Sequence, residues 1–152
     1  MQQSDKERLL RYIEDVSGMP GLFFEAARTE RKLPGVIKKR YRVVWPEYKN
    51  DPGMAYGYNR SEVSLGAATT DEIWRYDRAL VLSLHHPYSA LVWACAHSSV
   101  KRERGVAWTK IARILGMSAP TLKKRFEEAM LDMFFELKRP QMAADEREGG
   151  KV

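Results

Sequence analysis

With 152 residues, of which 44% are hydrophobic and 11% aromatic, the chain is long enough to enclose a core and too apolar to be largely disordered. Its formal net charge of +6 suits a polyanionic partner, although soluble proteins of other functions also carry such a charge. The first residues lack the apolar run of a signal peptide, and no uninterrupted apolar segment reaches membrane-spanning length, so we expect a cytoplasmic protein without a membrane partner. The single cysteine, Cys95, excludes an intrachain disulfide, and its apolar neighbours predict a buried, inert thiol.

Two helices are predicted at the start of the chain. Residues 4–16 have apolar side chains at helical spacing, with Ser4 as the candidate N-cap and Glu7 three residues later. The glycines and the proline of residues 18–21 interrupt this pattern, and residues 22–32 resume it. Residues 36–67 have no clear periodicity, although residues 41–45 are compatible with a short strand.

Helical patterns return at Thr70, where Asp71 and Glu72 are typical of a first turn. Apolar side chains then recur at helical spacing: Ile73, Trp74, Leu80, Val81 and Leu84. His85 and His86 interrupt this helix, and Pro87 suits the first turn of the next one.

Residues 108–126 have the pattern of a helix-turn-helix, a motif whose second helix lies in the major groove of DNA. Four side chains share one face of the first helix: Trp108, Ile111, Ala112 and Leu115. Gly116 can take the left-handed conformation that ends a helix, and Met117 fills the corner. Ser118 is a strong N-cap candidate for the second helix, and Pro120 is tolerated in its first turn. A helical hairpin that binds no nucleic acid is the alternative, but the spacing, the corner glycine and the basic outer face together favour DNA binding.

The second helix of this motif is predicted to continue until Pro140 ends it. Its inner positions form a sustained apolar stripe: Leu122, Phe126, Ala129, Met130, Met133, Phe134 and Leu137. A helix of this length exceeds what a minimal three-helix DNA-binding unit needs. The stripe therefore either packs on the N-terminal helices, which we favour, or forms the seam of a homodimer.

Together these elements predict an all-α fold, in which a helix-turn-helix domain packs with N-terminal helices and an irregular middle segment. We divide the chain into three parts. Residues 1–69 contain the N-terminal helices and the irregular segment, residues 70–139 form the DNA-binding domain, and residues 140–152 are a disordered tail.

The sequence contains no constellation that predicts catalysis, cofactor binding or metal binding. His85 and His86 are neighbours at a helix break, and neighbouring side chains on a regular backbone point apart. Cysteine and carboxylate side chains are missing near them at the spacing of a zinc site, and there is no glycine-rich phosphate loop. We therefore expect a binding protein that is not an enzyme.

The start of the second helix supplies the candidates for reading base edges. They are Ala119, Pro120, Thr121, Lys123 and Lys124. Lysine can donate to guanine, threonine can bond a base or touch a thymine methyl, and proline contributes only apolar contact. For each lysine, a solvated helix face is the alternative role.

Two basic regions supply the candidates for phosphate contacts. Those near the motif are Arg102, Arg104, Lys110, Arg113 and Arg125, and those in the basic segment of residues 28–49 are Lys38, Lys39 and Arg40. Arg125 can instead pair with Glu127 or Glu128 of its own helix.

Residues 87–137 resemble the helix-turn-helix of sigma-factor region four. The shared positions are Trp108, Ile111, Ala112, Leu115 to Ser118, Thr121, Leu122 and Arg125. More broadly, the chain resembles an uncharacterised helix-turn-helix family of phages and prophages. That likeness spans most of residues 23–137 and includes Phe24 to Ala27, Trp45 with Pro46, Ala55 to Gly57 and Leu91 to Trp93. The resemblance implies a phage origin and DNA contact, and it brings no settled function.

Three functions are consistent with these features. The favoured one is a small regulator of phage or prophage transcription that binds double-stranded DNA. The second is a packaging protein similar to a terminase small subunit, which the lack of a long heptad region disfavours. The third is a sigma-like module that docks on host RNA polymerase and contacts DNA little, which the basic outer face of the second helix disfavours.

Overall fold

The computed structural model describes residues 1–33, 66–100 and 102–139, and within these ranges it confirms the all-α fold. Six α-helices and one short 3-10 helix make up the regular structure there, with no strand among them. In chain order they are α1 (Gln3–Ile13), η1 (Val16–Gly18), α2 (Met19–Lys32), α5 (Thr70–Ser83), α6 (Ser89–Ser99), α7 (Trp108–Leu115) and α8 (Ala119–Lys138). The predicted strand at residues 41–45, most of the irregular segment and the tail from residue 140 lie outside the described residues.

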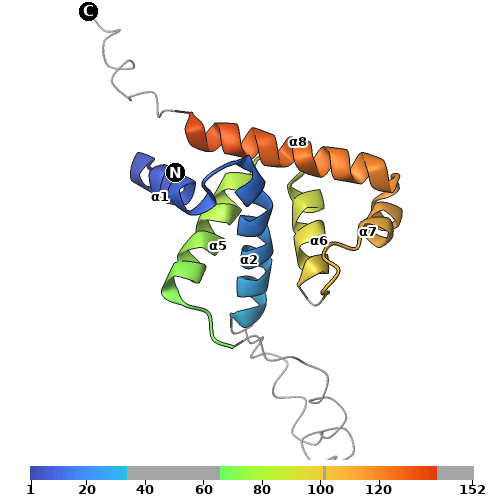
Figure 1. Ribbon diagram of the computed structural model, residues 1–152, viewed down its shortest axis with the longest axis horizontal. Coiled ribbons are helices and arrows are strands. Elements are labelled where there is room, and N and C mark those ends of the chain that lie inside the picture. The colour runs from blue at the N-terminus through green and yellow to red at the C-terminus, as the bar shows by residue number, and fades with distance from the viewer. Residues whose placement is uncertain (34–65, 101, 140–152) are drawn as a thin grey trace, which may run out of the picture.

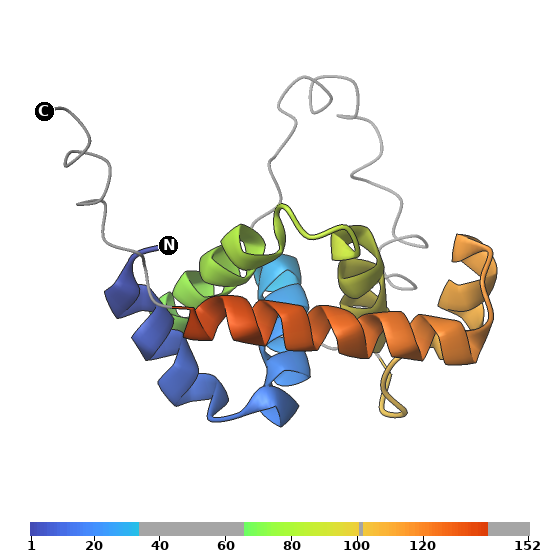
Figure 2. The ribbon, with the colours of Figure 1, turned by 90° about the horizontal axis from the view of Figure 1, so that it is seen from above.

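Helix α8 lies across the other helices and joins the two ends of the molecule. Figure 1 shows α2 between α5 and α6 with α8 running over them, and Figure 2 shows α8 crossing the molecule from above. Helix α1 lies near the C-terminal end of α8, whereas α7 lies at its N-terminal end. As a result, α7 and the first turns of α8 project at one end, away from α1 and α5.

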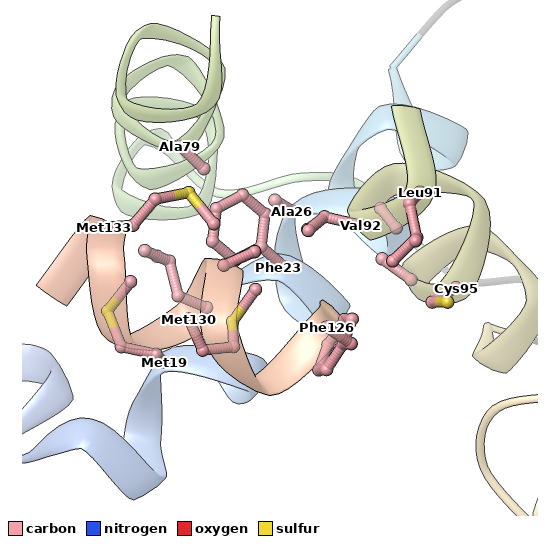
Figure 3. Packing of buried hydrophobic residues seen from close by; sticks show 14 of the residues in the cluster. Met19, Phe23, Ala26, Ala79, Leu91, Val92, Cys95, Phe126, Met130 and Met133 are labelled. Carbon is pink, nitrogen blue, oxygen red and sulfur yellow. The ribbon is translucent and has the colours of Figure 1, made fainter. Parts of the chain in front are cut away.

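The core is one continuous cluster that forms around the inner face of α8. All seven predicted inner positions of this helix are buried: Leu122, Phe126, Ala129, Met130, Met133, Phe134 and Leu137. They share the cluster with Leu9 of α1, Phe23 of α2 and Val92 of α6. Figure 3 shows Met133 reaching toward Phe23. The stripe therefore packs within the chain as predicted, and residues on both sides of the expected boundary at 69–70 belong to the same core.

Several helix ends differ from the sequence predictions by a few residues. Helix α1 begins at Gln3, and its N-cap is Gln2 without a side-chain bond, so Ser4 is not the cap. Helix α2 begins at Met19, because Pro20 is accommodated in its first turn, where no backbone N–H is needed. Helix α6 begins at Ser89, so Pro87 precedes this helix.

Helix α5 turns a different face to the core from the one its apolar stripe indicates. Four of the stripe residues are exposed: Ile73, Leu80, Val81 and Leu84. The buried positions are Ala79 and Ser83, where Ser83 Oγ accepts a hydrogen bond from the Trp93 indole at 2.9 Å. Small side chains let α5 approach α2 closely, so packing overrides the apolar pattern at this helix.

Ion pairs fix this orientation of α5 against α1 and α2. The Arg75 guanidinium binds both Glu25 oxygens at 2.8 Å, and Arg78 binds Asp5 at 2.8 Å. Bidentate arginine–carboxylate bonds favour one geometry more strongly than a lysine pair does. The charged face of α5 thus points toward its neighbours, and much of its apolar face points to solvent.

Glu72 joins the start of α5 to the end of α2. Its carboxylate accepts hydrogen bonds from the Thr69 N–H at 2.8 Å and from the Lys32 ammonium at 2.9 Å. Thr69 Oγ1 accepts in turn from the Glu72 N–H, which completes a capping box for a helix that starts at Thr70 as predicted. The Lys32 hydrogen bond and then the Thr69 bond lower the pKa of Glu72 from 4.5 to about 2.

Lys6 ties α1 to the C-terminal end of α8. Its side chain is buried, and its ammonium donates hydrogen bonds to the carbonyl oxygens of Glu136 at 3.3 Å and Arg139 at 3.2 Å. Carbonyl groups at a helix C-terminus lack partners within the helix, and they carry the negative end of its dipole. Lys6 therefore caps α8 from a segment at the other end of the chain.

We expect the Glu72→Gln variant to be less stable than the wild type at neutral pH, because glutamine cannot pair ionically with Lys32. A carboxyl group whose pKa is lowered by folding stabilises the fold above its ordinary pKa of 4.5, and loses that contribution as the pH falls to about 2. The difference in unfolding free energy between wild type and variant should shrink over this range. Urea unfolding at several pH values measures it, with the exposed Glu128→Gln as control. A difference that does not change with pH would contradict this role of the ionised carboxylate.

Candidate nucleic-acid interface

The turn between α7 and α8 is built around Gly116, whose φ of +71° lies in the left-handed region. The Gly116 N–H donates to the Arg113 carbonyl at 3.3 Å, and the Met117 N–H donates to the Ala112 carbonyl at 2.9 Å. This pair of bonds is the Schellman motif, which satisfies the last carbonyl groups of a helix. Gly116 therefore ends α7 in the conformation that the sequence predicts.

Helix α8 begins immediately after this turn. Ser118 Oγ accepts a hydrogen bond from the Thr121 N–H at 3.3 Å, and Pro120 occupies the first turn. The predicted N-cap and the predicted position of the proline are confirmed. We refer to residues 108–126, from the start of α7 to Phe126, as the α7–α8 corner.

The inner side of the α7–α8 corner joins the core. Ile111 and Ala112 are buried as predicted, and the Trp108 ring meets the Phe126 ring edge-on at a centroid distance of 5.5 Å. Leu115, predicted on the same face, is instead 38% exposed. It is the last residue of α7, and the chain turns away there before α8 can cover it.

The five candidates for base contact are not equally available to a ligand. Pro120, Lys123 and Lys124 are exposed. Ala119 is half-buried and packs against the core, and the Thr121 hydroxyl is engaged with Ser118 Oγ at 2.7 Å. The outward-facing candidates are therefore the proline and the two lysines.

Lys123 is held near α7 by an aromatic ring. Its ammonium lies 5.7 Å from the centroid of the Trp108 ring, within the range of a cation–π interaction. This contact restricts the side chain of Lys123, whereas no ring contact holds Lys124 within the described part of the chain. The two neighbouring lysines thus differ in how freely they can reach a ligand.

The candidates for phosphate contact separate into three groups. Arg102, Arg104, Lys110 and Arg113 are exposed. Arg125 is half-buried, and its guanidinium lies 5.6 Å from the centroid of the Tyr88 ring, so it faces α6 as well as solvent. Lys38, Lys39 and Arg40 lie outside the described residues.

Positive charge dominates this end of the molecule. Between Arg102 and Phe126, Glu103 is the only acidic residue. The first turn of α8 contains no acidic side chain, and its backbone N–H groups carry the positive end of a helix dipole. An exposed helix start among arginine and lysine side chains favours contact with an anionic surface such as a phosphate backbone.

Cys95, His86 and His97 are buried or engaged in contacts within the chain, whereas His85 is exposed. Cys95 is buried, and burial raises the pKa of its thiol to about 11, which supports the prediction of an inert residue. His86 lies 3.1 Å from Asp132, and His97 lies 2.7 Å from Glu30. Within residues 1–33, 66–100 and 102–139, no three His, Cys, Asp or Glu side chains lie close enough to hold a metal ion.

Two exposed apolar side chains of α7 were not anticipated as functional from the sequence. Ile114 is 68% exposed, and it lies next to Leu115 at the end of α7. The helical position of Ile114 follows from the sequence pattern, but its exposure depends on how α7 is rotated against α8. This position adds an apolar contact point to an otherwise basic surface.

The chain belongs to the DUF6362 family, described as a domain of unknown function, whose model matches residues 31–133. This match covers about two thirds of the chain and includes α5, α6, α7 and most of α8. No curated protein and no solved structure matches the chain. None of the helices in the described ranges combines the length and the apolar character required to cross a bilayer.

We expect Gly116→Ala to lower the free energy of unfolding by about 1 kcal/mol, because an alanine side chain is strained at this positive φ. Open space surrounds the position where the new Cβ would lie, so the backbone conformation alone causes the loss. The matched control is Gly21→Ala, a helical glycine of α2 with equally open surroundings, which should leave stability unchanged or raise it by up to about 1 kcal/mol. Urea unfolding measures both, and equal effects of the two changes would contradict the proposed role of Gly116.

Proposed function

We propose that the protein is a DNA-binding regulator of phage or prophage transcription, and that the α7–α8 corner acts as a helix-turn-helix. The observation that carries this proposal is the combination of a tightly capped turn with exposed basic side chains on both of its helices. The resemblance of the same residues to sigma-factor region four and to phage helix-turn-helix proteins supports it. The bonded turn pre-orders the start of α8, so binding would require little further ordering of the backbone.

In this proposal the first turns of α8 enter the major groove of double-stranded DNA. Lys124 and Lys123 donate to guanine O6 and N7, and Pro120 contributes shape and apolar contact. Lysine is a flexible point donor, so two neighbouring lysines give a preference for guanine-containing steps rather than recognition of one fixed base. The Thr121 hydroxyl contributes less, because it is bonded to Ser118.

Phosphate contacts in this proposal come from the residues that flank the reading helix. Lys110 and Arg113 lie on the exposed side of α7, and Arg102 and Arg104 lie in the segment before it. Such contacts fix the register of the protein on DNA without reading sequence. Arg125 is better placed to support α8 against Tyr88 than to reach a phosphate freely.

A protein-docking module remains the second candidate function, because Ile114 is largely exposed beside Leu115. Apolar side chains at a basic surface suit a partner such as RNA polymerase better than they suit phosphate groups. A terminase-like packaging role is the third candidate, and it requires a ring of many subunits. Measurement of the mass in solution separates packaging from the other two functions.

The central experiment is selection of bound sequences from a random double-stranded DNA library. We expect the wild type to enrich a defined motif, and the double variant Lys123→Ala/Lys124→Ala to lose the enrichment, because both exposed lysines are removed from the reading helix. Lys138→Ala is the matched control, since Lys138 is an exposed lysine at the opposite end of α8. If the wild type enriches no motif, and the double variant binds DNA as strongly as the wild type does, the regulator proposal is wrong.

Arg113→Ala should behave differently from the lysine variants. Because a phosphate contact carries no base information, we expect weaker binding to all sequences with the enriched motif unchanged. The slope of log K against log salt concentration should decrease in magnitude by about 0.9, because the variant neutralises one phosphate fewer. Fluorescence anisotropy titrations at several salt concentrations measure this slope. An altered motif would show instead that Arg113 reads bases.

A further inference from the structure

An apolar surface hollow lies along the C-terminal half of α8, away from the α7–α8 corner. It has a volume of about 800 Å³, and three large exposed hydrophobic side chains line it: Val81 and Leu84 of the α5 end and Phe135 of α8. Leu84 is 68% exposed and Phe135 is 62% exposed. We call this surface, with its lining residues from α5, the α5–α6 turn and α8, the α5–α8 face.

The core leaves these side chains outside because the inner positions around them are already filled. On α8, Met133, Phe134 and Leu137 pack inward, and Phe135 therefore points to the opposite side. On α5, the ion pairs to α1 and α2 turn the apolar stripe outward. Single exposed apolar residues are ordinary, but several that line one hollow with a polar rim are typical of a protein interface.

The charges around the hollow indicate which kind of protein covers it. The charged side chains that line it are Lys6, Arg139, Asp132 and Glu136, two basic and two acidic. This face is thus electrically balanced on a chain of net charge +6. Two copies of so basic a chain repel one another over most orientations, and a balanced face is where that repulsion is smallest. Within each copy, Arg139 pairs with Glu136 at 3.2 Å and Lys6 is bonded to two carbonyl oxygens of α8, so these charges add little repulsion between two copies.

The shape of the α5–α8 face also suits a second copy. A symmetric pair uses the same surface twice, so each copy must supply both a protruding group and a recess. Phe135 and Leu84 are exposed where they line the hollow, and the hollow is large enough to receive apolar side chains. Asp132 is held by His86 at 3.1 Å, which fixes one part of the rim before association.

We propose that two copies of the chain pair through the α5–α8 face around a two-fold axis near Phe135. Fourteen positions separate Thr121 from Phe135 along α8, which corresponds to about 21 Å of helix. Pairing near Phe135 therefore places two reading ends up to about 40 Å apart, and closer when the two helices are inclined. Successive major grooves on one side of B-DNA are about 34 Å apart. The spacing part of this inference rests on the proposed DNA binding, whereas the pairing itself does not.

Sedimentation of the full chain without DNA tests the pairing. We expect the wild type to sediment as a dimer, and Phe135→Glu and Leu84→Glu to raise the dimer dissociation constant by about thirtyfold or more, the loss typical of an apolar hot spot. Ile114→Glu is the matched control, since Ile114 is as exposed as Leu84 but lies on α7. Both α5–α8 variants replace exposed residues, and far-UV circular dichroism checks that they remain folded.

A monomeric wild type, an assembly larger than a dimer, or a dimer that Phe135→Glu and Leu84→Glu leave intact would each overturn the pairing. Selection of DNA from the random library is independent of this outcome. A dimer that enriches no DNA motif refutes only the proposed function. A monomer that enriches a single half-site refutes only the pairing. Enrichment of two inverted half-sites about one helical turn apart, abolished in Phe135→Glu, supports both.

Discussion

Burial of the inner face of α8 is the interaction on which the rest of the molecule depends. Seven of its side chains enter the core, and burying each large one stabilises the fold by roughly 1.5–3 kcal/mol relative to exposure. The same helix begins at the basic corner and ends beside α1. The start of α8 is therefore positioned by the core rather than by a loop. Any surface at that end, including Lys123 and Lys124, is held in a fixed orientation relative to the α5–α8 face.

The elements that depend on neighbouring residues were predictable from the sequence. The inner stripe of α8, the left-handed Gly116 and the Ser118 cap all follow from spacing or from backbone preference over a few residues. The orientation of α5 was not predictable in this way. It depends on Arg75 meeting Glu25, a pair 50 residues apart in sequence, and an apolar stripe carries no information about such partners. The most regular pattern of α5 thus pointed to the wrong face.

The position of the candidate interface in the chain was predictable from the sequence. Which of its side chains are free to contact a ligand was less predictable. The pattern places Ala119 and Thr121 beside the lysines, but core packing covers part of Ala119 and the cap engages the Thr121 hydroxyl. The engagement of Thr121 follows from capping chemistry, because an N-cap hydroxyl lies beside the third residue of the helix. The contact of Arg125 with Tyr88 depends on how α6 lies against α8, and no local rule predicts it. The α5–α8 face also depends on how its helices lie against one another, so the sequence pattern does not predict it either.

The bond from Lys6 to the end of α8 has a consequence for how the protein is made. Its two acceptors lie 130 and 133 residues after it, so this contact joins the two ends of the described chain. Helices α2 and α6 pack directly on each other, with the Phe23 and Trp93 rings 5.4 Å apart, whereas the face that α2 shares with Phe126 is covered only when α8 docks. Contacts of such long sequence separation slow folding, and transiently exposed apolar surface is what chaperones bind. The contact between α1 and α8 therefore forms late in folding, and the basic corner takes its fixed orientation only once α8 has docked on the other helices.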